Sequence, residues 1–235
     1  MFNPHPRLER LNVGGVHDVW VVDDVLLQPE ALRQRAISAR ASFTAAPHNA
    51  YPGLEWRMGA DVDAPLAEFF MLHLRQRFGA RRTLSMYSRL SLATLQPALL
   101  RPLQRLCHRD RLGVEPGQCV AACTLYLFDD AALGGTSFYL PRRPVEHINA
   151  DIRRWAQMDD AAFTAEVSTP PGYLAASNAH FELAAVVPAA WNRAVFYNGS
   201  HFHSSHITAP DKLSNDPARG RLTLNGFFIC RSAAA

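Results

Sequence analysis

The stretch CHRDRLGVE, residues 107–115, holds a His-Arg-Asp tripeptide whose meaning decides the fold expected of this chain. His-Arg-Asp occurs in the catalytic loop of protein kinases, where the Asp is the catalytic base. A His-x-Asp pair on a β-strand also supplies two of the three ligands of an iron site built from two histidines and one carboxylate. The remainder of the sequence has to discriminate between these two interpretations.

The kinase interpretation requires residues that the chain lacks. In the kinase loop a Leu follows the Asp directly, and a magnesium-binding Asn comes four residues after that Leu. Those positions hold Arg111 and Glu115. The sequence also contains neither a G-x-G-x-x-G loop nor an Asp-Phe-Gly triplet, and 235 residues are few for a kinase domain. The kinase interpretation therefore fails.

The metal interpretation agrees with strand geometry. Residues i and i+2 of a strand point to one side, so His108 and Asp110 are expected to share a face. A second histidine from a later strand would complete a site of two histidines and one carboxylate, with open positions for a cosubstrate and O₂. The segment FYNGSHFHSSHIT, residues 196–208, supplies three candidates: His201, His203 and His206.

The order of the expected elements predicts an α+β protein. Residues 19–40 favour a strand that leads into a helix, with Pro29 in the first turn of that helix, and a second helix is expected over residues 64–79. From residue 83 onward, short strands separated by Gly, Pro, Asn and Asp indicate a sandwich or barrel. One helix, over residues 145–167, is expected to interrupt these strands. We therefore expect helices packed against a double β-sheet.

Composition limits the classes of function. The chain has 235 residues and is 48% hydrophobic, with no repeat or linker, so one domain over residues 1–235 is expected. A net charge of +3, with arginines scattered among acids, does not predict a nucleic-acid surface. No run of about 18 apolar residues and no signal peptide is visible, and the four cysteines form no CxxC pair. We expect a cytoplasmic protein without a membrane segment; the sequence leaves a homodimer open.

Four motifs in order give the sequence a family resemblance. They are HRD (108–110), TLYLFDDAALGGTSFYLP (124–141), RAVFYNGSHFHSSHI (193–207) and GRLTLNGFF (220–228). This order resembles the iron(II)/2-oxoglutarate-dependent dioxygenases, especially their prolyl-hydroxylase-like branch. The resemblance covers about residues 83–230. It implies a double-stranded β-helix (a jelly-roll or cupin-like core) over that range, preceded by an α/β segment at about 17–80 whose helices pack on one sheet.

The resemblance implies a ligand set for iron(II). His108 and Asp110 match the first histidine and the carboxylate, and His203 matches the distal histidine because it follows the FYNG turn as the family's histidine does. In this interpretation the three residues are both the catalytic centre and the metal ligands. His201 and His206 remain alternatives to His203.

The resemblance also implies a site for 2-oxoglutarate. Arg221 matches the basic residue that holds the distal carboxylate, a role that suits a planar guanidinium able to donate two parallel hydrogen bonds. Thr223 lies on the same strand face and could add a hydroxyl donor. Tyr87 and Tyr126 are further candidates for the cosubstrate pocket.

The implied activity is an O₂-dependent oxidation, most simply hydroxylation of a small molecule, an amino acid or a peptide side chain. Two other functions are compatible with the residues. His201 and His203 share strand parity, so they could form the His-x-His pair of a cupin-like metalloenzyme that does not use 2-oxoglutarate. A non-catalytic binding protein could also keep the fold, with Asp110 as a turn cap and His108 as a core histidine. The sequence does not identify the substrate.

Overall fold

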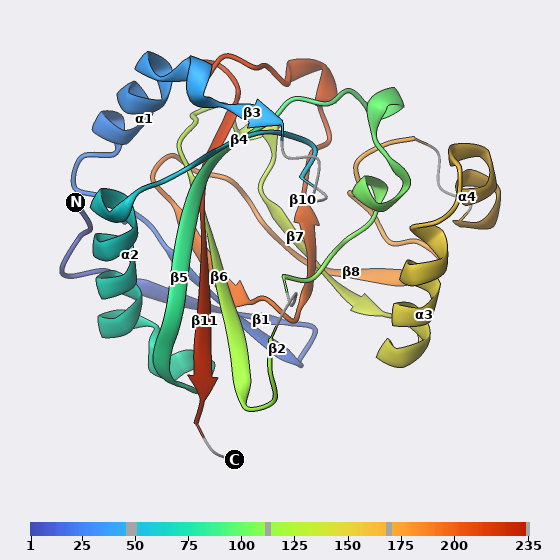
Figure 1. Cartoon of the computed structure of the whole chain (residues 1–235), viewed down its shortest axis with the longest axis horizontal. Helices are drawn as coiled ribbons and strands as arrows, with labels where there is room; N and C mark the ends of the chain where they lie inside the picture. Colours follow the sequence, from blue (N-terminus) through green and yellow to red (C-terminus); the bar gives the residue numbers. More distant parts are fainter. Residues whose placement is uncertain (46–50, 111–113, 168–170, 234–235) are drawn as a thin grey trace.

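Two antiparallel β-sheets form the centre of the computed structural model, which describes residues 1–45, 51–110, 114–167 and 171–233 (Figure 1). Among these residues, eight strands form a large sheet in the order β1-β2-β9-β6-β11-β5-β4-β3, and three form a small sheet in the order β10-β7-β8. The strands of the large sheet are β1 (Leu8–Val13), β2 (His17–Val22), β3 (Thr44–Ala45), β4 (Gly53–Arg57), β5 (Ala80–Ala93), β6 (Gln118–Tyr126), β9 (Ala194–Asn198) and β11 (Arg221–Ser232). Those of the small sheet are β7 (Thr136–Pro141), β8 (Phe181–Val187) and β10 (Phe202–Ser205).

Alternation along β11 gives the large sheet two different faces. Leu222 and Leu224 belong to the apolar core that lies under the first two helices. Arg221 and Thr223, on the opposite parity, point to the face that the small sheet covers. Both sets are almost fully buried, because helices cover one face and strands the other. The large sheet therefore has an outer, helix-covered face and an inner face that can carry a site.

Helices α1 (Pro29–Ser38) and α2 (Ala60–His73) cover the outer face, on one side of the sheet in Figure 1. Pro29 occupies the first turn of α1, where its missing N–H costs no hydrogen bond. On α2, Phe70 is fully buried and stacks on Phe228 of β11 with ring centroids 4.0 Å apart. Full burial of such a side chain contributes about 1.5–3 kcal/mol. The two helices and the antiparallel sheets confirm the expected mixture of helices and sheets.

The small sheet faces the inner side of the large sheet. The ring of Phe138 on β7 meets that of Tyr197 on β9 edge-on, with centroids 5.4 Å apart. The hydroxyl groups of Tyr126 on β6 and Thr136 on β7 are hydrogen-bonded at 2.7 Å. An apolar cluster between the sheets contains Val187, among others. The two sheets therefore enclose a second core, and the polar groups on its margin are available for a site.

The segment predicted as one helix over residues 145–167 is instead two helices, α3 (Val145–Trp155) and α4 (Asp160–Val167), so that prediction was wrong. The Asp159 carboxylate accepts a hydrogen bond from the backbone N–H of Ala162 at 2.8 Å, as residues that begin a helix do. The ring of Trp155 meets Phe163 at 90°, so the break lets both helices bury an aromatic side chain. Figure 1 shows both helices beside β8, away from α1 and α2.

Short 3₁₀ segments complete the described elements, at Arg40–Ser42, Arg75–Phe78, Pro97–Leu99, Pro102–Arg105, Ala131–Leu133 and Pro210–Lys212.

Beyond the pairing of β2 with β9, an ion pair joins the turn after β2 to the turn before β9: Arg193 donates to the two carboxylate oxygens of Asp23 at 2.6 and 3.0 Å. Within the described part of the chain, no helix combines the length and the apolar character that crossing a membrane requires.

Candidate metal centre and the adjacent arginine pocket

The His-Arg-Asp segment lies along the free edge of β10. His108 and His203 exchange two backbone hydrogen bonds, N–H to C=O in each direction, both 2.9 Å long. Two residues further on, the N–H of Asp110 donates to the carbonyl of Gly199 at 2.7 Å. The expected strand is thus shortened to a single bridge, but the bridge is enough to extend the small sheet and to fix both side chains on one side.

His108, Asp110 and His203 bring three donor groups together, and their ligand atoms all lie within 4.8 Å of one another. Nε2 of His108 is 3.6 Å from Oδ1 of Asp110, and Nε2 of His203 is 3.3 Å from Oδ2 of the same carboxylate. The side chains of His203 and Asp110 are 5% and 11% exposed, whereas that of His108 is 50% exposed. The group is therefore open to solvent on the His108 side only.

The hydrogen bonds of His203 indicate what this group can bind. Nδ1 lies 2.9 Å from the carbonyl oxygen of His201, which can only accept, so Nδ1 carries a proton. In the neutral ring, Nε2 then presents a lone pair to Oδ2 of Asp110. That oxygen is buried and has no hydrogen-bond partner among the described residues. Two electron-rich atoms in this arrangement need a cation between them, and a metal ion fits the set of donors.

Electrostatics keep two of the donors in the state that binds metal. Although half of its side chain is exposed, loss of water around the ring, and then the charge of His203, lower the pKa of His108 to about 4, so its imidazole is neutral. Burial raises the pKa of Asp110, but the two histidines outweigh it and the pKa lies below its ordinary value. For His203, burial lowers the pKa, and the negative charge of Asp110 outweighs this and raises it. A metal ion would take the place of the proton that His203 shares with Asp110.

The other two candidate histidines lie elsewhere. The ring of His201 stacks on that of His17 from β2, with centroids 3.7 Å apart. His206 follows the end of β10. Burial, and then the positive charge of Arg221, lower the pKa of His206. The geometry thus brings His203, and neither neighbour, to the carboxylate.

Arg221 begins β11 on the inner face and is only 2% exposed. Its Nε donates to the carbonyl of Gly134 at 3.2 Å, and its Nη2 donates to that of Gly135 at 2.8 Å. Gly134 has φ of +82°, and a Cβ there would lie 1.8 Å from the carbonyl oxygen of His206, so only glycine suits the position. These two bonds use two of the five N–H donors and fix the plane of the guanidinium.

Two of the predicted cosubstrate residues lie near Arg221, and one does not. Thr223 and Tyr126 are register partners on β11 and β6, and both are buried. Tyr87 is six residues along β5 from Ala93, the partner of Arg221, which corresponds to roughly 20 Å of strand. Sequence analysis missed Tyr51, a partly buried tyrosine whose pKa is raised to about 12 by loss of solvent and is also influenced by the charge of Arg221.

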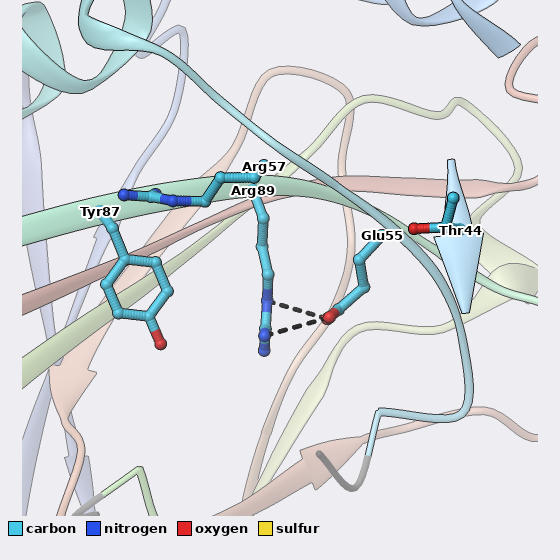
Figure 2. Close-up of a pocket in the computed structure, with 5 residues that line it drawn as sticks. All are labelled: Thr44, Glu55, Arg57, Tyr87 and Arg89. Carbon is cyan, nitrogen blue, oxygen red and sulfur yellow. Dashed lines mark hydrogen bonds and ion pairs between the residues drawn. The ribbon is translucent and has the colours of Figure 1, made fainter. Parts of the chain in front are cut away.

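Tyr87 instead lines a cavity of about 430 Å³ with Thr44, Glu55, Arg57 and Arg89, the arginine pocket (Figure 2). The Arg89 guanidinium extends into it and pairs with the Glu55 carboxylate, with Nε–Oε1 at 2.9 Å and Nη1–Oε2 at 3.2 Å. Sequence analysis did not find Glu55, Arg57 or Arg89. Charged residues at alternate strand positions are typical of a solvent-facing strand, so nothing in the pattern marks them as lining a cavity.

Two antiparallel sheets with a His-Asp-His donor group on the inner margin define a candidate metal-binding protein. The chain belongs to the family described as "Family of unknown function (DUF6445)", whose model matches residues 4–228. A search of curated proteins gives no significant match.

Several solved structures are similar to this chain at low identity. HygX from Streptomyces hygroscopicus, with nickel and 2-oxoglutarate bound, is 12% identical over 92% of this chain and 84% of its own, with a TM-score of 0.48. EvdO2 from Micromonospora carbonacea var. aurantiaca, complexed with 2-oxoglutarate, is 15% identical over 98% and 96%, with a TM-score of 0.44. SnoN, a non-heme alpha ketoglutarate dependent epimerase from nogalamycin biosynthesis, is 12% identical over 89% and 76%, with a TM-score of 0.41.

Proposed function

We propose that this protein is an iron(II)- and 2-oxoglutarate-dependent oxygenase of the prolyl-hydroxylase-like type, which hydroxylates a small molecule, an amino acid or a peptide side chain. The observation that carries the proposal is the convergence of His108, Asp110 and His203. Their donor atoms lie within 4.8 Å of one another, and one buried carboxylate oxygen has no hydrogen-bond partner among the described residues. Two imidazoles and one carboxylate form the facial set that leaves coordination positions open.

The path of the chain supports a double-stranded β-helix, with residues 1–235 as one domain. β5 is followed by the His108 bridge, β6 by β7 and β8, and β9 by β10 and β11, so the chain passes repeatedly from the large sheet to the small one. Four adjacent strands of the large sheet, β9-β6-β11-β5, then face a small sheet made of the bridge segment, β10, β7 and β8. Jelly-roll folds are wound in this way.

The spacing between the triad and Arg221 suits a cosubstrate that carries a second carboxylate. His203 pairs with Phe138 on β7, three residues from Gly135, whose carbonyl accepts the hydrogen bond of Arg221. Three residues of strand span roughly 10 Å, enough for a five-carbon dicarboxylate to reach from one to the other. Arg221 would hold the distal carboxylate by charge-assisted hydrogen bonds, and Thr223 would add a hydroxyl.

In this proposal the side chains position the metal and exclude water from it, and the bound groups supply the oxidation. Iron(II) and 2-oxoglutarate, when bound, supply an O₂-dependent oxidation coupled to decarboxylation of 2-oxoglutarate to succinate. His108, Asp110 and His203 would hold the metal, and the His201 carbonyl would fix the tautomer of His203. The buried inner face would exclude water on the His203 side, leaving the half-exposed His108 side for substrate.

Anaerobic addition of iron(II) and 2-oxoglutarate tests the proposal. Chelation by the keto and carboxylate oxygens should give a visible charge-transfer band and raise the melting temperature above that with iron alone. Glutarate, which lacks the keto oxygen, is the matched control and should give no band. If the metal binds but 2-oxoglutarate produces neither a band nor a thermal shift, the protein is instead a metalloprotein that does not use 2-oxoglutarate.

A further inference from the structure

The arginine pocket contains a continuous stack of two guanidiniums and two aromatic rings. The guanidinium of Arg57 lies 4.6 Å from the ring centroid of Tyr87, that ring stacks on Phe227 at 4.8 Å, and Arg89 lies 4.8 Å from the Phe227 centroid. Aromatic faces attract cations, and stacking restricts the rotamers of long side chains. Both guanidiniums are therefore held in position before a ligand binds.

The pocket opens on the side of the large sheet that faces the metal centre. Tyr87 and Arg89 are the register partners of Phe227 and Asn225, and Phe227 packs against the core between the two sheets. The ring of His203 lies 4.5 Å from that of Tyr197 on β9, and the register across β6 places Tyr197 in the same row as Phe227. The pocket and the triad therefore lie on the same face of the large sheet.

The charges in the pocket are not balanced by its own lining. The lining holds two guanidiniums and one carboxylate, Glu55, and the second carboxylate, Asp63, lies outside the lining and pairs with Arg57. Glu55 contacts Nε and Nη1 of Arg89, so these contacts leave the Nη2 donors to another acceptor. Arg57 is more fully engaged: Nη2 pairs with Asp63 at 3.5 Å, and Nη1 donates to the carbonyl of Ser88 at 2.7 Å. Arg89 is thus the better placed anchor, and Arg57 is a supporting cation.

We infer that the arginine pocket binds the carboxylate of an amino-acid-sized substrate, with Arg89 as the principal anchor and Arg57 as the second cation. This inference rests on the proposed function, since it assigns the substrate class of the same metal centre. A fixed guanidinium is suited to a carboxylate because its N–H donors match the two oxygens. The cavity of about 430 Å³ lies near the lower end of small-molecule sites, about 300–1,000 Å³.

The alternative is that Arg89 and Glu55 only join β5 to β4. Their side chains are 20% and 8% exposed, and a buried ion pair of this kind is a weak source of stability. The two roles are separable by substitution. A double variant, Glu55→Gln with Arg89→Gln, removes both charges together, so that neither is left buried without its partner. If the ion pair only joins the strands, ligand binding should survive this change; if Arg89 binds a carboxylate, ligand binding should be lost.

The test uses the full chain loaded with Ni(II) and 2-oxoglutarate. The probes are the common free amino acids, their N-acetyl derivatives and the corresponding carboxamides, measured by melting temperature and by saturation-transfer NMR. We expect at least one free acid to bind, with its carboxamide weaker by about tenfold or more. The N-acetyl series distinguishes a free amino acid from a substrate whose amine is blocked. Because Arg57 is half-exposed, Arg57→Gln should fold normally, so it still tests the pocket if Arg89→Gln does not fold.

Binding of the free acid should be lost in Arg89→Gln and in the double variant, and should be weakened in Arg57→Gln. Arg142→Gln is the control and should retain binding, because Arg142 pairs with Glu182 of β8 and does not line the pocket. Acids and carboxamides that bind equally, acids that bind the variants as well as the parent, or a panel in which no acid binds would each overturn the inference. A loss of 2-oxoglutarate affinity in Arg89→Gln would overturn it too, by assigning the pocket to the cosubstrate. If an acid binds through Arg89 while 2-oxoglutarate does not bind at all, the pocket assignment stands and the oxygenase proposal fails.

Discussion

Substituting Gly199→Ala tests whether the backbone beside the triad sets the metal geometry. Gly199 donates nothing to a metal, but its carbonyl accepts the N–H of Asp110 at 2.7 Å. A Cβ at this position would lie 3.1 Å from Cβ of Asp110 and 2.9 Å from Cγ1 of Val120. Val120 is buried in β6, where the close packing around it limits how far it can move. The added methyl group therefore acts against Asp110.

The size of the effect follows from these distances. Ordinary contacts begin near 3.4 Å, so Asp110 or Val120 must move by a few tenths of an ångström. Overpacking of this kind costs about 1–3 kcal/mol of stability. Displacing the carboxylate also disturbs a group whose Oδ2 lies 3.3 Å from Nε2 of His203. Changes in residues that support metal ligands lower metal affinity by about 10–100-fold, and we expect a loss in that range.

Nickel(II) affinity, measured by competition with a coloured chelator, and urea unfolding of the metal-free protein together check this expectation. Gly79→Ala is the matched control. Gly79 has φ of +61° with no atom within 4 Å of an added Cβ, so alanine there strains the backbone by about 1–2 kcal/mol without touching the triad. The reasoning is refuted if both variants lose stability and neither loses nickel affinity.

Three further expectations follow from the described contacts. His203→Ala should abolish metal binding, whereas His201→Ala and His206→Ala should retain the metal after desalting, as measured by elemental analysis; retention by His203→Ala would move the ligand role to a neighbour. Arg221→Ala should weaken 2-oxoglutarate binding by about tenfold or more in calorimetry while metal affinity is kept, because a charge-assisted hydrogen bond is lost. Asp23→Asn should cost about 1 kcal/mol or less at neutral pH. Hydrogen bonds from its arginine partner lower the pKa of Asp23 in the folded state, so this contribution is present above the unfolded pKa, about 3.9, and lost as the pH falls through the folded pKa. Urea titrations at neutral and acid pH should show the difference between parent and variant disappearing in acid.

The sequence predicts two members of the donor group from their local spacing and the third from the order of the motifs. The i, i+2 spacing of His108 and Asp110 places both on one side of any extended segment, whether or not a full strand forms. His203 is matched only through the family resemblance, and the bridge to His108 brings it alongside. Parity then separates His203 from His206. The sequence also predicted helices together with a double β-sheet, and the structure confirms this mixture of helices and sheets.

The sequence could not predict features that depend on which strands become neighbours. Glu55 and Arg89 meet because β4 pairs with β5, and no local pattern encodes that register. The division of residues 145–167 into two helices was missed for a different reason. The apolar pattern continues through residues 156–159, but the Asp159 carboxylate begins a new helix there. In the first case a long-range contact decides, and in the second a local cap outweighs periodicity.

The same backbone contacts that hold the small sheet together also set the distances within the triad. Two donors come from residues 108–110 and the third from β10, and the only regular pairing between these segments is the reciprocal pair of 2.9 Å hydrogen bonds that joins His108 to His203. A metal ion bound by all three side chains would join residues 108–110 to β10 a second time, through side chains as well as backbone. Metal affinity and the stability of this sheet edge are therefore linked, because any ligand that binds only the paired form stabilises the pairing. Gly199 has no ligand atom, but its carbonyl accepts the N–H of Asp110 beside this contact, so a substitution there should lower both quantities.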